Sequence, residues 1–492
     1  MGNERIPTGV PGLDSIVGGC GLIGQSLYLI KGVPGTGKTT IGLQFLLEGA
    51  RRGERCLYLG LSETRGQLDA LAKSFGWKLD GIDIHDMRRR EAEGRRPGAY
   101  TVFTPSEVEL EEIAREVLEQ VDRVKPARLV LDSLSEIRLL ADEPFRYRRE
   151  LLVLVDQIAG RGCTGLLIDV DVDGDQGMVA ETLVSGVVVV EQLSPEYGGD
   201  RRRLRVRKLR ASPSLGGYHD MAIGGNGVSV YPRLNAVSRQ VRHSTGALRS
   251  GIERLDALLG GGLDRGTSTV LIGPAGVGKS TLALQFLVHA AAQGESGVVL
   301  CFDESPTNML IRATGLGIPL QEHVDSGLIR VITVEPAEFS PGELAHRIRG
   351  CVEDGVRVLV IDSLNGYVSA MPEERSLAAH VHELLAYLAE KGVATLLTQH
   401  GFFSMDSLPV NVSYIADTIL LLRYFEAMGE VKQALSVLKK RTGRHERTIS
   451  ELQFTREGLR LGESIRCFQG VLSGVPRYLG PEFGGGPRES DE

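Results

Sequence analysis

Short apolar runs alternate with longer amphipathic segments along most of this chain. Examples of such runs are 128–132 and 165–169 in the first half, and 358–362 and 394–398 in the second. Each run has the length of a buried strand, and the segments between them carry the apolar spacing of helices. This alternation predicts an α/β fold in which each sheet is mainly parallel, doubly wound and flanked by helices.

The whole pattern occurs twice, in the same order. Lys38 and Lys279 lie 241 residues apart in matching surroundings, and Glu63 and Glu304 have the same separation. A repeat of this length indicates a duplicated domain. The expected limits are 1–234 for the first domain, 235–244 for a linker, 245–470 for the second domain and 471–492 for a flexible tail rich in Gly, Pro and acidic residues.

Each half contains a glycine-rich loop between an apolar run and a helical pattern. The loops at 32–39 and 273–280 both fit G-x-x-x-x-G-K-[ST] in full. Glycines allow successive N–H groups to face an anion, and the start of the following helix favours phosphate. Two full matches disfavour the alternative of a plain strand-to-helix turn. The predicted ATP-binding residues are Gly32, Val33, Pro34, Gly35, Thr36, Gly37, Lys38, Thr39, Thr40, Gly273, Pro274, Ala275, Gly276, Val277, Gly278, Lys279, Ser280 and Thr281.

A magnesium ion is expected beside each loop. Thr39 and Ser280 supply the hydroxyl that holds the metal in such sites. Asp132 and Asp362 end apolar strands, where a carboxylate can orient the same ion. A strand-terminal Asp is also a common turn former, but its pairing with a glycine-rich loop in both halves favours the metal role.

Hydrolysis also requires a group that orients or deprotonates water. The strand after each loop ends in Ser62-Glu63 in the first half and in Asp303-Glu304 in the second. Because the offset from the lysine is the same in both halves, Glu63, Asp303 and Glu304 are predicted to be catalytic rather than solvated surface carboxylates. The first half lacks a carboxyl group at position 62.

Composition and charge disfavour several classes of partner. A net charge of −7 provides no global basic field for nucleic acid or an anionic membrane. No apolar run approaches the ~18 residues of a membrane span, and the N-terminus lacks the apolar core of a signal peptide. We therefore expect a cytoplasmic chain without a nucleic-acid or membrane partner.

Together with Gly12-Leu-Asp, Ile361-Asp-Ser-Leu and a late Lys-x-Arg, these motifs make the chain similar to the KaiC family, the double-ring ATPases and autokinases of the circadian clock. The likeness runs from Ile6 to about Pro476 and is densest at 412–424. The resemblance implies two tandem RecA-like P-loop NTPase domains that use ATP and Mg²⁺. It also implies a homohexamer of two stacked rings with ATP between neighbouring subunits, and protein signalling partners of unknown identity.

The late Lys-x-Arg motif is Lys208 with Arg210 in the first half and Lys439 with Arg441 in the second. Its family counterparts contact the γ-phosphate of the neighbouring subunit. Neither loop has an obvious arginine nearby, so a cation supplied in trans would answer the need for charge neutralisation. The alternative is a solvated edge strand.

Three departures from the family pattern make the two halves unequal. The first half has Ser62 in place of a carboxylate and Gly186 where an Asp like Asp417 would be expected. In the second half the family's Ser-Thr phosphorylation pair reads Ser413-Tyr414. We therefore expect a more structural ATP site in the first half, and single-site phosphorylation of Ser413 in the second. Ser413 could equally be a helix cap or turn residue.

The sequence thus predicts a slow, Mg²⁺-dependent ATPase with serine/threonine autokinase activity in the second domain, in a signalling or clock-related role. Two alternatives stay open. One is a DNA-dependent recombinase or helicase-like motor, whose turnover would respond to single-stranded DNA. The other is a signalling scaffold whose bound ATP only holds the ring together, with negligible turnover.

Overall fold

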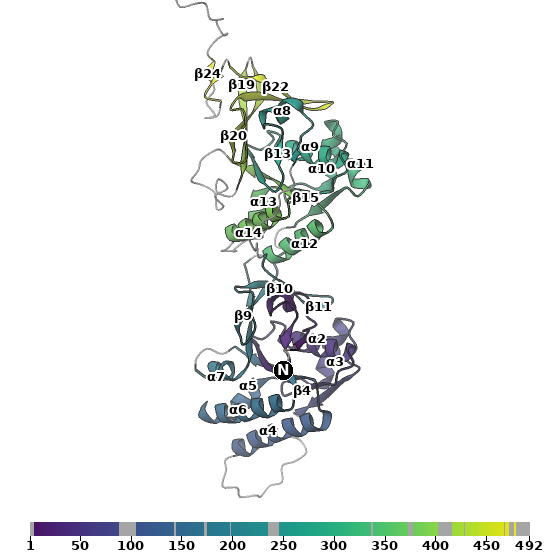
Figure 1. Cartoon of the computed structure of the whole chain (residues 1–492), viewed down its shortest axis with the longest axis vertical. Coiled ribbons are helices and arrows are strands. Elements are labelled where there is room, and N and C mark those ends of the chain that lie inside the picture. The colour runs from purple at the N-terminus through teal and green to yellow at the C-terminus, as the bar shows by residue number, and fades with distance from the viewer. Residues whose placement is uncertain are drawn as a thin grey trace, which may run out of the picture. The chain divides into compact units, whose positions relative to one another are not determined.

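The computed structural model of the chain divides into two compact units, Met1–Arg233 and Leu234–Glu492 (Figure 1). The residues that the structure describes are 4–87, 105–141, 144–171, 175–196, 198–234, 246–335, 338–371, 377–401, 416–427, 429–466, 468–471 and 477–478.

Within the described residues of the first unit, nine strands form one sheet in the order β11-β10-β9-β8-β3-β7-β6-β4-β5. The strands from β8 to β5 in this order are parallel, whereas β9, β10 and β11 are antiparallel. The central strand β3 is therefore flanked by β8 and β7. The strands are β3 (Leu27–Gly32), β4 (Cys56–Gly60), β5 (Ile82–Asp86), β6 (Arg128–Asp132), β7 (Thr164–Val170), β8 (Gly186–Leu193), β9 (Arg201–Leu209), β10 (His219–Gly224) and β11 (Gly227–Tyr231), with β1 (Arg5–Ile6) and β2 (Leu22–Ile23) in a separate pair.

Helices cover both faces of this sheet. The side chains of α2 and α3 pack into one apolar cluster, and those of α4, α5 and α6 pack into another on the opposite face. Strand β3 shows why both faces are covered, since Tyr28 and Ile30 belong to the first cluster and Leu27 and Leu29 to the second. The helices are α1 (Leu13–Ile16), α2 (Lys38–Arg51), α3 (Arg65–Ser74), α4 (Pro105–Val124), α5 (Leu134–Leu140), α6 (Pro144–Gly160) and α7 (Asp175–Leu183).

The second unit repeats this arrangement. In the part of it that the structure describes, the sheet order is β16-β15-β17-β18-β14-β19-β20-β21-β22, with β20, β21 and β22 antiparallel. The strands are β14 (Ser268–Gly273), β15 (Gly297–Cys301), β16 (Ile329–Thr333), β17 (Val358–Asp362), β18 (Ala394–His400), β19 (Thr418–Ala427), β20 (Glu430–Lys440), β21 (Ile449–Thr455) and β22 (Gly458–Ser464), with the small pairs β12 (Ala247–Leu248) and β13 (Leu263–Asp264), and β23 (Phe468–Gln469) and β24 (Arg477–Tyr478).

The helices of the second unit also form two layers. Side chains of α8, α9, α10 and α11 share one apolar cluster, and those of α12, α13 and α14 share the other. The predicted fold class, two mainly parallel α/β sheets with helices on both faces, is therefore confirmed. The helices are α8 (Glu253–Leu258), α9 (Lys279–Ala292), α10 (Pro306–Gly315), α11 (Leu320–Asp325), α12 (Pro341–Glu353), α13 (Leu364–Ser369) and α14 (Leu377–Glu390).

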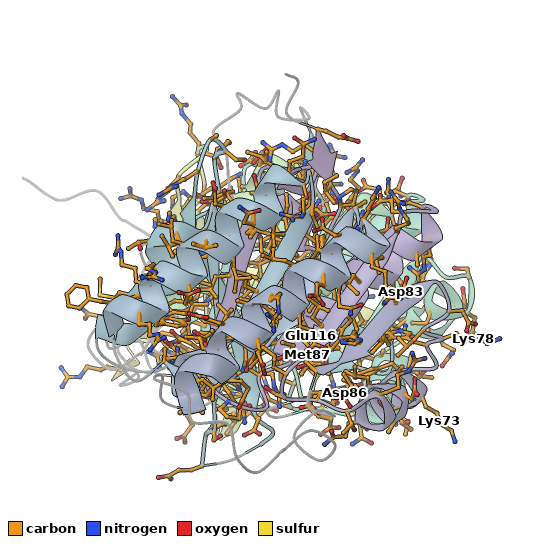
Figure 2. The ribbon with its side chains drawn as sticks, turned by 90° about the horizontal axis from the view of Figure 1, so that it is seen from below. Lys73, Lys78, Asp83, Asp86, Met87 and Glu116 are labelled. Carbon is orange, nitrogen blue, oxygen red and sulfur yellow. The ribbon has the colours of Figure 1, made fainter. Side chains whose placement is uncertain are left out.

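Charged side chains line the outer parallel strand of the first sheet. Figure 2 shows Asp83 and Asp86 on β5 with Glu116 of α4 nearby. His85 of the same strand pairs with Glu116 at 2.8 Å. Charges on an exposed strand edge oppose pairing with another chain.

Capping residues fix the start of the helix that follows each acid-bearing strand. Thr64 accepts the N–H of Gln67, and the Gln67 side chain accepts the N–H of Thr64, which is a complete capping box. In the second unit Ser305 accepts the N–H of Asn308, and Pro306 opens the helix. Each cap follows directly after the predicted catalytic glutamate and so holds the loop that carries it.

Within the described ranges, none of the helices combines the length and the apolar character needed to cross a bilayer.

Candidate nucleotide sites

The two glycine-rich loops lie at the carboxyl ends of the central strands. Gly32 ends β3 and Lys38 begins α2, while Gly273 ends β14 and Lys279 begins α9. The glycine before each lysine has φ near +90° to +100°, a conformation that a Cβ disfavours. A Cβ on Gly278 would also lie 2.2 Å from the Phe454 ring. The loops therefore require glycine where the sequence has it.

Both loop lysines lie over their own loops. Lys38 Nζ donates to the carbonyls of Gly32 and Val33, each at 2.8 Å, and Lys279 Nζ donates to the Pro274 carbonyl at 2.7 Å. Burial lowers the pKa of Lys279 to about 8, and Asp362 partly opposes this change. Burial also lowers the pKa of Lys38, against a pull from three nearby carboxylates.

The predicted magnesium ligands meet in each unit. Thr39 Oγ1 donates to Asp132 Oδ2 at 2.7 Å, and Ser280 Oγ donates to Asp362 Oδ1 at 2.9 Å. Carboxylate and hydroxyl oxygens suit Mg²⁺, which binds proteins through one or two such groups and keeps several waters. Among the described residues there is no cluster of three or more His, Cys, Asp and Glu side chains that could hold a metal. The donor set in each unit therefore fits Mg²⁺ with substrate and water as its remaining ligands.

The strand-terminal carboxylates have further donors that orient them. Tyr58 OH donates to Asp132 at 2.8 Å, and Thr398 Oγ1 donates to Asp362. Burial raises the pKa of Asp132, while its bonds to Thr39 and Tyr58 lower it. The equivalent carboxylates of the two units are thus held by different side chains, a tyrosine in the first unit and a threonine in the second.

The predicted catalytic acids lie between β4 and α3 in the first unit and between β15 and α10 in the second. Their hydrogen-bond partners differ between the two units. In the first unit Ser62 and Ser133 share a hydrogen bond at 3.0 Å. In the second unit the residue at the same place, Asp303, accepts a hydrogen bond from Ser363 at 2.5 Å. Glu63 is partly exposed. Glu304 forms an ion pair with Arg312 at 2.6 Å.

The structure adds a carboxylate to the first site that sequence reasoning missed. Asp169 is the penultimate residue of strand β7, which lies between β3 and β6 in the sheet, and it pairs with Arg138 at 2.8 Å. It is one of the carboxylates that act on Lys38. A signal was present, since 165–169 is an apolar run that ends in Asp, as 128–132 does. The second unit has Gln399 and Val368 at the corresponding positions.

Further charges surround the end of β3 in the first unit. Lys31, with only 8 % of its side chain exposed, pairs with Asp171 at 2.6 Å and with Glu181 at 2.7 Å. Ile272 is the counterpart of Lys31 in the second unit. The two P-loops therefore lie in different electrostatic surroundings, with a buried lysine and its two carboxylate partners next to the first.

An arginine also lies beside the first loop, which the sequence did not indicate. Arg202 Nε of β9 donates to the Gly35 carbonyl at 3.4 Å. The second loop has a phenol in a similar place, since Tyr424 OH of β19 donates to the Ala275 carbonyl at 3.3 Å. Strand β9 is far from the loop in sequence, so no local pattern could reveal this contact.

The residues of the late Lys-x-Arg motif have partners within their own unit. Lys208 Nζ donates to the carbonyls of Glu181, Thr182 and Val184 at 2.6, 3.4 and 2.8 Å. Arg210 donates to the Thr182 carbonyl at 3.2 Å. Their contact with a neighbouring subunit stays a prediction.

The second copy of the motif is held in a related way. Lys439 Nζ donates to the Ala416 carbonyl at 2.7 Å, and Arg441 lies 3.7 Å from Asp417. Burial lowers the pKa of both motif lysines. The counterpart of Asp417 is Gly186, where a Cβ would lie 2.7 Å from the Tyr28 ring. In the first unit the Tyr28 ring therefore occupies the space that an Asp side chain at position 186 would need.

The predicted phosphosite, Ser413, lies outside the described residues, as does Tyr414. They belong to the segment that connects β18 to β19.

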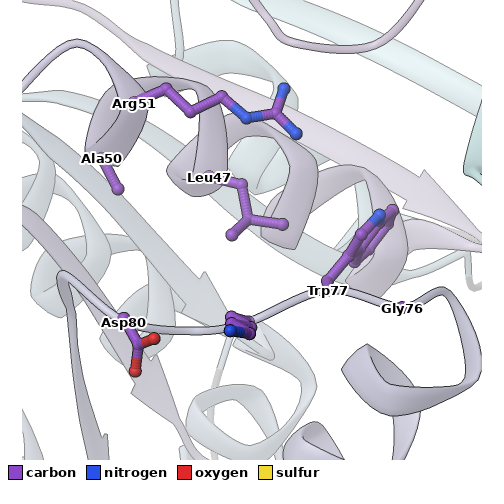
Figure 3. A pocket seen from close by; sticks show the side chains of 7 residues that line it. Leu47, Ala50, Arg51, Gly76, Trp77 and Asp80 are labelled. Carbon is purple, nitrogen blue, oxygen red and sulfur yellow. The ribbon is translucent and has the colours of Figure 1, made fainter.

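A surface cavity of about 370 Å³ lies in the first unit, away from the P-loop of that unit (Figure 3). It is lined by Leu47, Ala50, Arg51, Gly76, Trp77, Lys78 and Asp80. These residues surround the C-terminal end of α2, about 18 Å along the helix from Lys38 at 1.5 Å per residue. The cavity is therefore not part of the nucleotide site.

Comparison with known proteins gives one family over most of the chain. The family model described as "ATPase: KaiC" matches twice, at residues 6–235 and 248–465. The chain is 27% identical over 485 residues to the circadian clock oscillator protein KaiC of Parasynechococcus marenigrum, covering 97% of this chain and 94% of the relative. It is 29% identical to KaiC of Thermostichus vulcanus (97% and 92% covered) and 26% identical to the circadian clock protein KaiC3 of a Synechocystis strain (97% and 95% covered).

The buried pair of Arg138 and Asp169 gives a test of stability. Arg138→Val should destabilise the first unit by about 3–5 kcal/mol, because it leaves the buried Asp169 carboxylate without its partner. The double variant Arg138→Val/Asp169→Gln carries the side chains of the second unit and should recover most of that loss. Urea unfolding followed by the fluorescence of Trp77, the only tryptophan, reports on this unit. A single variant as stable as the wild type would contradict the expectation.

The lowered pKa of Lys279 predicts a pH dependence of nucleotide binding. Phosphate favours the charged ammonium, so ADP affinity at the second loop should be flat below pH 8 and fall about tenfold per pH unit above it. Calorimetry on the Lys38→Ala chain between pH 7 and 9.5 measures this. Lys279→Arg keeps its charge throughout and should remove the dependence. If the Lys38→Ala chain, which keeps Lys279, shows no change in ADP affinity up to pH 9.5, the lysine is fully charged over this whole range.

Proposed function

The chain belongs to the KaiC family of ATPases, and we propose that it is a Mg²⁺-dependent ATPase with two unequal sites and serine autokinase activity in the second unit. The observation that carries this proposal is the bond between a helix hydroxyl and a strand-terminal carboxylate beside each P-loop. In each unit this bond lies beside the P-loop at the carboxyl edge of that unit's parallel sheet, where nucleotides bind in such folds.

Each unit supplies the same set of roles. Lys38 and Lys279 neutralise the β- and γ-phosphates, while Thr39 with Asp132 and Ser280 with Asp362 hold the metal. Mg²⁺, when bound, neutralises charge on the transferring phosphoryl group. Glu63 orients water in the first unit.

Two acids serve this role in the second unit. Asp303 and Glu304 are adjacent in the loop between β15 and α10, and each accepts a hydrogen bond from a side chain of the same unit. Such fixed acids favour a defined position for the nucleophile. We infer that the second site is the more complete catalytic centre and that the first binds ATP with slower turnover.

We further propose that ATP lies between subunits of a homohexamer. The four cations of the Lys-x-Arg motif would then leave their present carbonyl and carboxylate partners for a neighbour's phosphate. A cation supplied by a neighbour stabilises charge in phosphoryl transfer. In this family the two domains of each chain would form two stacked rings.

In the autokinase step, the Ser413 hydroxyl would attack the γ-phosphorus of ATP and ADP would leave. Glu304, with Asp303 beside it, would serve as the base that takes the one hydroxyl proton. Tyr414 replaces the second phosphate acceptor of the family, and a phenol has a different reach from a threonine. The proposal is therefore a single phosphorylated residue in a protein with a signalling or clock-related role.

The decisive experiment combines native mass spectrometry, with and without ATP, and phosphosite mapping of the same sample. We expect ATP to produce a complex of six chains and one phosphate per chain at Ser413. Lys279→Ala should abolish phosphorylation while the first site still binds ATP, and Lys38→Ala should leave phosphorylation in place. Unchanged phosphate incorporation in Ser413→Ala would show that another residue is modified.

A second measurement separates turnover from a scaffold that only binds ATP. The double variant Glu63→Gln/Glu304→Gln keeps the shape of both side chains and should lower phosphate release by about 100-fold or more, because a positioned base contributes 10²–10⁴-fold. Its binding of ATP should be retained. Equal release by the wild type and the double variant would favour the scaffold, and stimulation by single-stranded DNA would favour a DNA-dependent motor.

A further inference from the structure

Arg312 links the acid loop of the second site to the P-loop helix. Its Nε and Nη2 donate to the two carboxylate oxygens of Glu304 at 3.2 and 2.6 Å. Its third nitrogen, Nη1, donates to Thr281 Oγ1 at 2.8 Å. Thr281 lies in the first turn of α9, directly after the residue that contacts Asp362. The Arg312 guanidinium therefore connects α10 with the loop after β15 and with the P-loop helix α9.

This arrangement differs from a surface ion pair. The side chains of Arg312 and Glu304 are each 27 % exposed, and both oxygens of the carboxylate are engaged. A planar guanidinium that binds a carboxylate through two parallel bonds fixes its orientation as well as its place. The bond to Thr281 in turn fixes the guanidinium. Rotation of the Glu304 carboxylate about its side-chain bonds is therefore restricted.

The first unit lacks this device although it has the same acceptors. Leu71 lies eight residues after Glu63, as Arg312 lies eight residues after Glu304, and Thr40 corresponds to Thr281. Leu71 packs against the apolar cluster below α3. Among the described residues, Glu63 has no ion-pair partner. Within the described residues, a guanidinium thus holds the glutamate of the second unit, and none holds that of the first.

We propose that Arg312 is a positioning residue of the second site, which holds the Glu304 carboxylate in place for the nucleophile. The inference rests on the proposed role of Glu304. Because a misplacement of about 1 Å can reduce a rate by about 100-fold, the presence of this arginine in one unit alone supplies a second source of inequality between the sites, independent of the missing carboxyl group at Ser62.

The test measures phosphate release and nucleotide affinity in full-length chains that carry Lys38→Ala, so that the second site is observed. Arg312→Leu, which installs the first unit's residue, should lower kcat by about 10- to 100-fold and leave KM and ADP affinity within about twofold. Arg312→Lys keeps the charge without the fork and should restore part of kcat. Arg349→Leu removes an exposed arginine paired with Glu353 on α12 and should change neither.

A double-mutant cycle decides whether Arg312 acts through Glu304. Glu304→Gln and Arg312→Leu/Glu304→Gln should have the same kcat, because the arginine has no carboxylate left to position. Losses that multiply would overturn the proposal, as would an unchanged kcat in Arg312→Leu or a loss of ADP affinity together with kcat. Those results leave the ATPase function standing. A Lys38→Ala chain that still assembles with ATP but shows no turnover would refute both the proposed function of the second site and the role of Arg312.

Discussion

The hydrogen bond between a hydroxyl in the first helical turn and a carboxylate at a strand end is the contact on which both sites depend. It connects Thr39 to Asp132 and Ser280 to Asp362 across an intervening strand of each sheet. Because the strands are parallel, their carboxyl ends meet at one edge. A loop that binds phosphate, an acid that binds metal and an acid that activates water can therefore converge, although they lie far apart in the chain. Loss of this parallel order would move the acids to the opposite edge.

The sequence predicted the groups whose position follows from local pattern. A glycine-rich loop between a strand and a helix, and an acid at the end of an apolar run, have a known place in a parallel sheet, so the P-loops, Asp132 and Asp362 could be assigned. Asp169 could have been found by the same rule. The roles of Arg312 and Arg138 could not be predicted from the sequence. Each is one of many helical arginines, and its partner depends on how elements distant in the chain pack together. Arg202 reaches its loop from a distant strand. The position of Ser413 stays a prediction.

The two units differ in charge as well as in catalytic acids. The first unit is not short of carboxylates, since Asp169 and Asp171 lie near its P-loop, but these are paired with Arg138 and Lys31. The second unit has neutral side chains at the corresponding positions and instead uses a guanidinium to hold Glu304. Both units have kept the glycine-rich loop and the bond between a helix hydroxyl and a strand-terminal carboxylate, whereas the surrounding ionic pairs have diverged. Inequality between the sites is therefore distributed over several contacts and could not be removed by one substitution.

The lysine of the first Lys-x-Arg motif is already saturated. An ammonium has three N–H donors, and Lys208 directs them at three carbonyl oxygens near the end of α7. Any contact with a phosphate on another molecule would be an exchange of partners rather than a gain of new bonds. The net free energy of such an exchange is small, and a charged phosphate competes better than a neutral carbonyl. The proposed contact across subunits would therefore depend on the difference in acceptor strength between phosphate and carbonyl, and not on the number of bonds that Lys208 forms.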